Sequence, residues 1–338
     1  MDKELISQQE ASDFIDNVLN IKVENFDERT GLQFLNTMIE RFFEEIPFQN
    51  LYLLSNTRLP SFEEIKSNMF NRVGGICFEL NMFMGQLLQA FGYHVYMVKG
   101  VENGGEDSLP HTFLVAENVE NEGDAYCVDV GFGYPMFFAV PIHDLAVGDL
   151  DTKGYALGYW AFKFTRETED RYCLRSFDDS KRPQDVVEFM DNVEMPKHPS
   201  WTEEYSFYLK PLSYQEASVI MEPVYTLPLQ SYFLVNFHCV TFRGKKALAY
   251  KNMALLRERT HDCKLKLQEV FYSLPDLQES IVEHFTAFDE EIVEAALKNL
   301  ETNQAKSPHL VAKVNKMRKR SICQERAMSF TIHGDISP

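Results

Sequence analysis

The hydrophobic pattern of this chain changes abruptly at Gly92, and that change limits the folds that its 338 residues can adopt. Before Gly92, apolar residues such as Leu35, Met38 and Phe42 recur at spacings of three and four, which is typical of helices with one buried face. After it come short β-rich runs separated by Gly, Asn, Asp and Pro, a pattern that indicates an antiparallel sheet or barrel. We therefore expect a helical bundle followed by a β domain.

The rest of the chain mixes the two patterns. Strand-like runs recur in SYFLVNFHCVTF and KKALAYKNMALL, and the segment from Leu277 to Leu300 is helical in pattern. The stretch from Asp178 to Glu203 is rich in Asp, Glu and Pro, so we expect a long surface excursion there. The sequence predicts an α+β protein of three domains: 1–92 as a helical bundle, 93–210 as the β domain, and 211–338 as an α/β unit with a polar C-terminal tail.

Charge and cysteine usage argue against several functional classes. The net charge of −18 disfavours binding to nucleic acid or to an anionic membrane surface. The N-terminal run MDKELISQQEASDF has no signal-peptide pattern, and no apolar run reaches the roughly 18 residues of a membrane span. The six cysteines form no close pairs, so we expect no zinc site, no redox dithiol and no disulfide framework. A cytoplasmic, reducing setting and a protein without a metal are expected.

Cys77 is the candidate nucleophile. Gly74 and Gly75 lead into it, and an apolar stripe that includes Leu80 and Phe83 starts directly behind it, so the thiol is expected at a helix N-terminus. The unpaired amides and the dipole of a first turn stabilise a thiolate, and glycines let backbone amides approach an oxyanion closely. The alternative interpretation is a buried structural cysteine.

A predicted hairpin supplies partners for this thiol. The strands HTFLVAE and AYCVDVG flank the turn-like run NVENEGD, whose centre falls near Glu120 or Asn121. With the centre at Glu120, His111 and Asp129 lie opposite each other with Cβ atoms about 5 Å apart. A slip of two residues still leaves them on one face as diagonal neighbours. Taken singly, each residue also fits a structural role, as a strand histidine or a turn-capping aspartate.

Together the three residues predict a catalytic triad. Cys77 is the nucleophile, His111 its base and later its proton donor, and Asp129 fixes the tautomer of the imidazole. The same triad serves acyl transfer to an amine or to water. A papain-like or transglutaminase-like cysteine hydrolase is therefore an alternative, and a catalytically silent binding protein of the same fold is another.

The run NRVGGICFELN around Cys77 resembles the nucleophile motif of the arylamine N-acetyltransferases. Further blocks resemble those of the family in the same order along the chain, so the resemblance covers nearly all of it. The ending from Ser329 to Ile332 is similar to that of the animal enzymes. The other matching blocks are IPFQNL, PHTFLVAE, VDVGFG, SFYLKPL, TLPLQSYF and KNMALL.

This resemblance implies a fold and an activity. The fold would be a helical bundle, an antiparallel β-barrel and an α/β lid, with a cysteine-protease-like core between the first two. Acetyl-CoA would acetylate Cys77, and an arylamine, hydrazine or N-hydroxyarylamine would then take the acetyl group, in a ping-pong reaction of xenobiotic metabolism. The residues carried over are Phe48 and Phe132 as walls of the acceptor pocket, and Asp107, Ser108 and Ser329 as contacts of coenzyme A.

The chain departs from the family pattern beside the nucleophile. Val73 stands where the family usually has an arginine before the two glycines, and the nearest arginine is Arg72. Gln49 stands in place of the usual glutamate of the Pro-Phe-Glu-Asn-Leu block. We expect the two changes to compensate each other, because the missing glutamate could have paired with the missing arginine.

Overall fold

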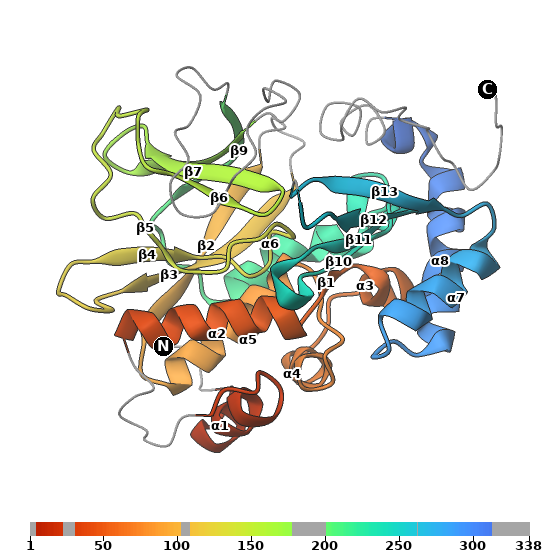
Figure 1. Cartoon of the computed structure of the whole chain (residues 1–338), viewed down its shortest axis with the longest axis horizontal. Helices are drawn as coiled ribbons and strands as arrows, with labels where there is room; N and C mark the ends of the chain where they lie inside the picture. Colours follow the sequence, from red (N-terminus) through yellow and green to blue (C-terminus); the bar gives the residue numbers. More distant parts are fainter. Residues whose placement is uncertain (1–4, 23–30, 103–108, 178–200, 262, 313–338) are drawn as a thin grey trace.

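The computed structural model describes residues 5–22, 31–102, 109–177, 201–261 and 263–312. All three predicted coenzyme A contacts, Asp107, Ser108 and Ser329, lie outside this part of the chain. Figure 1 shows the N-terminal helices at the bottom, a large sheet at the upper left, and a second sheet with two long helices at the right. Helices and a curled antiparallel sheet thus form an α+β fold, as the sequence predicts.

The N-terminal region is helical where the apolar spacing predicts it. Leu35, Met38 and Phe42 are completely buried on one helix. A capping box starts one of these helices, since the Ser61 amide donates to Glu64 at 2.8 Å and the Glu64 amide donates to the Ser61 hydroxyl at 3.3 Å. The helices are α1 (Gln8–Asn17), α2 (Gly31–Glu45), α3 (Leu51–Asn56), α4 (Phe62–Phe70) and α5 (Cys77–Ala90).

An antiparallel sheet of eight strands follows, in the order β5-β4-β3-β2-β9-β8-β7-β6. Helix α5 packs against β2 and β3, which explains why the interior of β3 is buried on both faces. The strands are β2 (His94–Glu102), β3 (Pro110–Glu117), β4 (Ala125–Val128), β5 (Val140–Pro141), β6 (Gly154–Leu157), β7 (Trp160–Arg166), β8 (Arg171–Phe177) and β9 (Trp201–Tyr208).

One boundary in this sheet was predicted wrongly. The predicted excursion from Asp178 to Glu203 ends in β9, whose first residue is Trp201, and residues 178–200 lie outside the described part. Strand β9 pairs with β8 and also with β2, about 100 positions earlier in the chain. Pairing with such a distant strand is not visible in local composition.

The C-terminal region builds a five-stranded antiparallel sheet in the order β1-β10-β11-β12-β13, with helices beside it. One prediction here is corrected, because the YFL part of the expected strand is a 3-10 turn, η4 (Tyr232–Leu234). The segment from Leu277 to Leu300 is helical as predicted and contains parts of two helices. The elements are β1 (Phe48–Gln49), β10 (His238–Thr241), β11 (Leu248–Lys251), β12 (Ala254–Glu258), β13 (Leu265–Val270), α6 (Tyr214–Thr226), η5 (Arg243–Lys245), α7 (Leu274–His284) and α8 (Glu290–Lys306).

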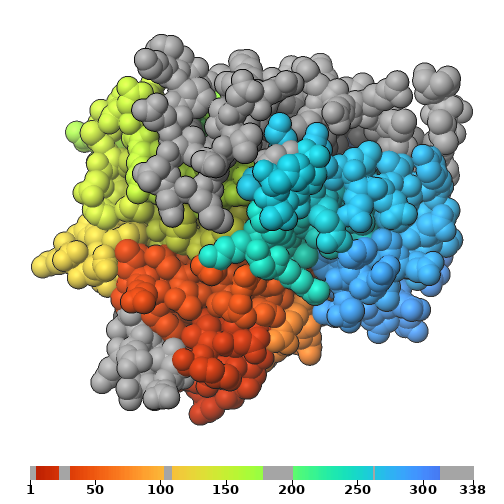
Figure 2. All heavy atoms as spheres, in the orientation of Figure 1, coloured from red at the N-terminus to blue at the C-terminus, as the bar shows by residue number. Residues whose placement is uncertain are grey.

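The first and third regions are joined through β1, which lies between α2 and α3 in sequence but pairs with β10. Buried Asn50 fixes this junction. Its side-chain nitrogen donates to the carbonyls of Phe233 and Asn236, both at 2.6 Å, and its oxygen accepts from the His238 amide at 2.8 Å. Figure 2 shows the three regions packed against one another on one face. The domain boundaries at 92 and 210 stay predictions.

None of the described helices combines the length and apolar composition that a membrane span requires.

Candidate active site

Cys77 is the first residue of α5, as the sequence predicts, and the chain around it is packed too closely for side chains at two glycines. Gly74 has a φ of +76°, and a Cβ there would lie 1.9 Å from the carbonyl oxygen of Pro47. A Cβ on Gly131 would lie 2.6 Å from the Cα of Cys77. These contacts fix the backbone on both sides of the thiol.

The start of α5 is also held by a buried carboxylate. Glu79 accepts a hydrogen bond from the Ile76 amide at 3.0 Å and another from the hydroxyl of Tyr225 on α6. Burial raises the pKa of Glu79 to about 7, and the hydrogen bonds only partly oppose this. The turn that carries Cys77 is therefore tied to the C-terminal region through a group that titrates near neutral pH.

His111 lies on β3 and is 3% exposed. Its Nε2 is 2.7 Å from Oδ2 of Asp129, which leaves Nδ1 as the nitrogen available for its hydrogen bond with the Cys77 thiol. Burial acts to lower the pKa of His111, but the charge of Asp129 and the hydrogen bonds with Asp129 and Cys77 outweigh it and hold the pKa well above its usual value. Such an imidazole holds a proton firmly, which favours an imidazolium beside the sulfur.

Asp129 is held by four groups, two on each oxygen. Besides His111, Oδ2 accepts from the Tyr205 hydroxyl at 3.0 Å. Oδ1 accepts from the side chain of Asn81 at 3.0 Å and from the Gly131 amide at 3.1 Å. Sequence reasoning gave no role to Tyr205, which comes from the distant β9. It missed the role of Asn81 too, although Asn81 lies four residues after Cys77, one helical turn along α5.

The hairpin places His111 and Asp129 as diagonal rather than directly opposite neighbours. In the structure Val115 pairs with Cys127, so the turn is centred on Asn121, and Asp129 follows the last residue of β4. The predicted register with its centre at Glu120 is thus wrong by two residues. The side chains still meet, because a slip of two keeps both on the same face of the sheet.

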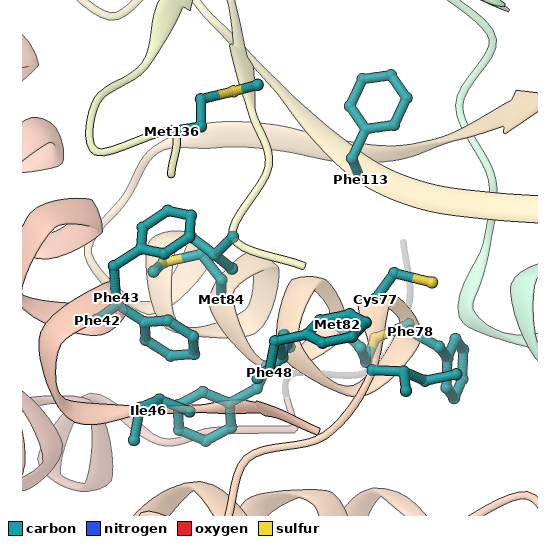
Figure 3. Close-up of a cluster of buried hydrophobic side chains, with 14 of the residues drawn as sticks. Phe42, Phe43, Ile46, Phe48, Cys77, Phe78, Met82, Met84, Phe113 and Met136 are labelled. Atoms are coloured by element: carbon teal, nitrogen blue, oxygen red, sulfur yellow. The ribbon is translucent and has the colours of Figure 1, made fainter. Parts of the chain in front are cut away.

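Aromatic rings surround the triad. The ring centroid of Phe132 lies 5.2 Å from that of His111 and 5.2 Å from that of Tyr205. Phe48 is buried, with its ring centroid 6.3 Å from that of Phe233. Figure 3 shows Phe48 with Cys77 in one cluster of buried apolar side chains. Phe48 thus lies in the core, half-buried Phe132 packs against it, and the role of both toward an acceptor stays a prediction.

The two departures from the family pattern face the same space. Gln49 and Val73 both line a cavity of about 40 Å³, together with Asn68. The side-chain nitrogens of Gln49 and Asn68 are buried there without a hydrogen-bond partner in the described structure. Arg72 does not line this cavity. Its side chain bonds to Glu45 at 3.1 Å and to backbone carbonyls at the end of α1.

One group of possible metal ligands lies away from the triad, at Glu167, Cys173 and Glu203. Two arginines already neutralise these carboxylates. Arg171 pairs with Glu167 and lies 3.1 Å from Glu203, and Arg175 pairs with Glu167 and lies 3.6 Å from Glu203. The group is therefore explained as an ion-pair network formed by the β7–β8 connection, β8 and β9.

Comparison with known proteins agrees with this geometry. A family model described as N-acetyltransferase matches residues 31–287. The chain is 32% identical over 105 residues to the probable arylamine N-acetyltransferase 3 of Dictyostelium discoideum, an alignment that covers 29% of this chain and 34% of that relative. Across the curated relatives it matches, the chain spans between 34% and 56% of their length.

Solved structures share the fold. The arylamine N-acetyltransferase of Nocardia farcinica superposes with a TM-score of 0.68 at 19% identity, covering 89% of this chain and all of that one. The Mycobacterium marinum enzyme, solved in complex with CoA, superposes with a TM-score of 0.65 at 18% identity, and the match covers 86% of this chain and 99% of that one. With the family model spanning most of its length and the fold matching, this chain belongs to the arylamine N-acetyltransferase family.

Proposed function

We propose that this protein carries an acetyl group from acetyl-CoA, through a thioester on Cys77, to an arylamine, hydrazine or N-hydroxyarylamine. The observation that carries the proposal is the arrangement of Cys77, His111 and Asp129, with the thiol at a helix start and the imidazole held between thiol and carboxylate. The choice of donor is supported by the Mycobacterium marinum relative, which was solved in complex with CoA. The protein is proposed to act in the cytoplasm on foreign amines, where a reducing setting keeps the thiol free.

The first half-reaction acetylates the enzyme. Nδ1 of His111 holds the proton of the Cys77 thiol, and the thiolate attacks the carbonyl carbon of acetyl-CoA. A carbon–sulfur bond forms to Cys77, the bond to the CoA sulfur breaks, and CoA leaves with the proton from the imidazolium. In this proposal, the backbone amides at the start of α5 stabilise the oxyanion.

The second half-reaction transfers the acetyl group. The acceptor nitrogen attacks the thioester carbon, so a carbon–nitrogen bond forms while the bond to the Cys77 sulfur breaks. The proton of the amine passes to His111 and from there to the departing sulfur. Phe132 and Phe48 supply flat apolar walls that suit an aromatic acceptor. The rival hydrolase would differ only in using water in this step.

Intact mass spectrometry tests the proposal directly. After incubation with acetyl-CoA, wild type is expected to gain one acetyl group, and an aromatic amine such as aniline is expected to remove it as the acetanilide. Cys77→Ala should gain nothing. Cys263→Ala is the matched control, because Cys263 is the more exposed of the described free cysteines, and its adduct should match that of wild type.

Absence of the adduct in wild type, or its persistence in Cys77→Ala, would remove the transferase proposal. Discharge that is equally fast with and without amine would favour the hydrolase.

A further inference from the structure

Glu102 places a carboxylate on the same sheet face as His111. It is the last residue of β2, where Gly100 pairs with His111 and Glu102 pairs with Tyr205 of β9. Side chains two positions apart in a strand point to one face, and so do directly paired residues. Glu102, His111 and Tyr205 therefore share the face on which the Tyr205 hydroxyl binds Asp129.

The surroundings of Glu102 connect it to the nucleophile as well. Its Oε1 accepts a hydrogen bond at 3.1 Å from the hydroxyl of Tyr232, a residue of η4. Burial is the main cause that raises the pKa of Tyr232, and the charges of Glu102 and of Cys77 raise it further. Burial raises the pKa of Glu102 itself to about 7, and the charge of His111 is the largest opposing influence. The carboxylate thus lies within electrostatic reach of His111, and Tyr232 lies within reach of both the carboxylate and Cys77.

A second carboxylate lies beside it. Glu204 is the extra residue of a bulge in β9, where pairing shifts from Leu174–Tyr205 to Arg175–Glu203. It accepts a hydrogen bond from Ser176, and its charge acts on Glu102 and on Tyr134.

Tyr134 connects this acidic pair to the aromatic wall. Its ring centroid lies 5.2 Å from that of Phe132, the ring beside His111. Burial and the charges of Glu204 and Glu102 raise the pKa of Tyr134. In the described chain, no lysine or arginine is among the groups that influence the pKa of Glu102. The aromatic wall therefore borders two carboxylates for which the described residues supply no lysine or arginine partner.

We infer that Glu102 makes the acceptor side of the site selective for amines that carry a second, positively charged nitrogen, and unfavourable for amines that carry a carboxylate. This inference rests on the proposed transferase function. A cation on the acceptor gains a charge-assisted partner in a partly buried setting, whereas an acceptor carboxylate is brought beside like charge. Glu102 is in this sense a specificity residue and takes no part in the proton transfers.

Three para-substituted anilines of similar shape test the inference. They are 4-amino-N,N-dimethylbenzylamine, which is cationic, 4-aminobenzyl alcohol, which is neutral, and 4-aminobenzoate, which is anionic. Wild type is first acetylated with acetyl-CoA and freed of CoA, and the discharge rate of the acetyl-enzyme is then measured with each aniline at about pH 8, where Glu102 is mostly ionised. The expected order is cationic, then neutral, then anionic.

Glu102→Gln removes the charge with little change in shape. The ratio of the cationic to the anionic rate should fall about tenfold or more, as expected for the loss of roughly 1.4 kcal/mol of charge preference. Glu117→Gln is the matched control. Glu117 lies at the other end of the β2–β3 ladder and likewise accepts a tyrosine hydroxyl, from Tyr96 at 2.9 Å. The Glu117→Gln variant should keep the ratio of the cationic to the anionic rate within about twofold of the wild-type ratio.

The outcomes separate this inference from the proposed function. If wild type forms no acetyl adduct, the transferase proposal itself fails. If the adduct forms but wild type discharges the anionic aniline as fast as the cationic one, or if Glu102→Gln leaves the ratio unchanged, the inference about Glu102 is overturned and the transferase stands. The order of rates in wild type decides the matter even if the variant does not fold.

Discussion

The two sides of Cys77 are held in different ways. On the sheet side, Asp129 has four hydrogen-bond partners, and His111 is fixed between that carboxylate and the thiol. On the opposite side, Gln49 and Val73 face a cavity in which two amide nitrogens have no partner in the described structure. The loop there is held by backbone contacts, such as the Gln49 amide donating to the Gly75 carbonyl at 2.9 Å.

This difference follows from what each side has to do. Proton transfer requires the imidazole to keep one tautomer and one orientation, so its supports are fully paired side chains. The loop only has to present backbone amides and the thiol, which close packing at Gly74 already achieves. A side-chain ion pair can be lost on that side with less effect on the chemistry. Changes on the sheet side should therefore mainly lower the rate, and changes on the loop side should mainly alter stability.

The largest effect is expected from Asp129→Asn. The amide cannot hold the imidazolium or its tautomer, so acetylation of Cys77 should slow by about a thousandfold or more while the fold persists. Single-turnover acetylation followed by mass spectrometry measures the rate. Asp124→Asn is the matched control from the same hairpin. Its carboxylate accepts three backbone amides of the turn, so that variant should lose stability but keep its rate. Full activity in Asp129→Asn would exclude this residue from the mechanism.

Glu79→Gln should change how stability depends on pH. Native Glu79 keeps its proton up to about pH 7, while the unfolded chain releases it near 4.5. Its contribution to the free energy of unfolding is therefore complete below about pH 4.5 and is lost as the pH rises through about 7. The free energy of unfolding of the variant, relative to that of wild type, should therefore increase by up to about 3 kcal/mol from pH 5 to pH 8.

Urea unfolding of both proteins at the two pH values measures this gain. The opposite shifts of Glu10 and Glu64, whose pKa values are lowered to about 2, act below this window. Glu294→Gln, on the exposed side of α8, should show no such gain. Equal gains in both variants would mean that Glu79 is not responsible.

Asn81→Ala is expected to have an intermediate effect on rate. Without this amide one oxygen of Asp129 loses its side-chain partner, and acetylation should slow about tenfold to a hundredfold. The pH profile of acetylation should also shift, because a displaced carboxylate no longer holds the pKa of His111 as high. Gln86→Ala is the matched control, because it removes another side-chain amide of α5 that bonds to Leu5 and Gln89 rather than to Asp129. A uniform loss at every pH in Asn81→Ala would indicate a purely structural role.

The smallest effect concerns the loop side, where Gln49→Glu and Val73→Arg restore the family's residues. Each single change should destabilise, because it buries one charge without its partner. The double variant should recover, with a coupling of about 1 kcal/mol or more in thermal or urea unfolding. The absence of coupling would contradict the idea that the two departures compensate each other. It would also show that side chains at positions 49 and 73 do not meet across the cavity.

Much of the sheet side could be expected from the sequence because its signals are local. Gly74, Gly75 and the stripe behind Cys77 predict a thiol at a helix start, and α5 begins at Cys77. The hairpin predicts that His111 and Asp129 share a face, although the register built on a centre at Glu120 was wrong by two residues, because the turn is centred on Asn121. A register error of two preserves the face, so the prediction of neighbouring side chains did not depend on the exact turn.

The supports of the triad could not be predicted in the same way. Tyr205 reaches Asp129 from β9, and Glu102 meets Tyr232 across 130 positions of chain. Such contacts depend on which strands pair and on how η4 packs, and no periodicity in the sequence encodes these choices. Asn81 lies inside the nucleophile motif, yet its role appears only when its partner's position is known.

The sequence by itself determined the family, the kinds of secondary structure and the three residues proposed for catalysis, since these are written in motifs and in periodicities of a few residues. Only the tertiary structure decided which groups hold Asp129, that Arg72 bonds to Glu45 and does not line the cavity beside Val73, and that carboxylates border the aromatic wall. The physical reason is the kind of neighbour between which each interaction acts. Backbone propensity and patterning act between near neighbours in the chain, whereas burial, hydrogen bonding and charge act between near neighbours in space.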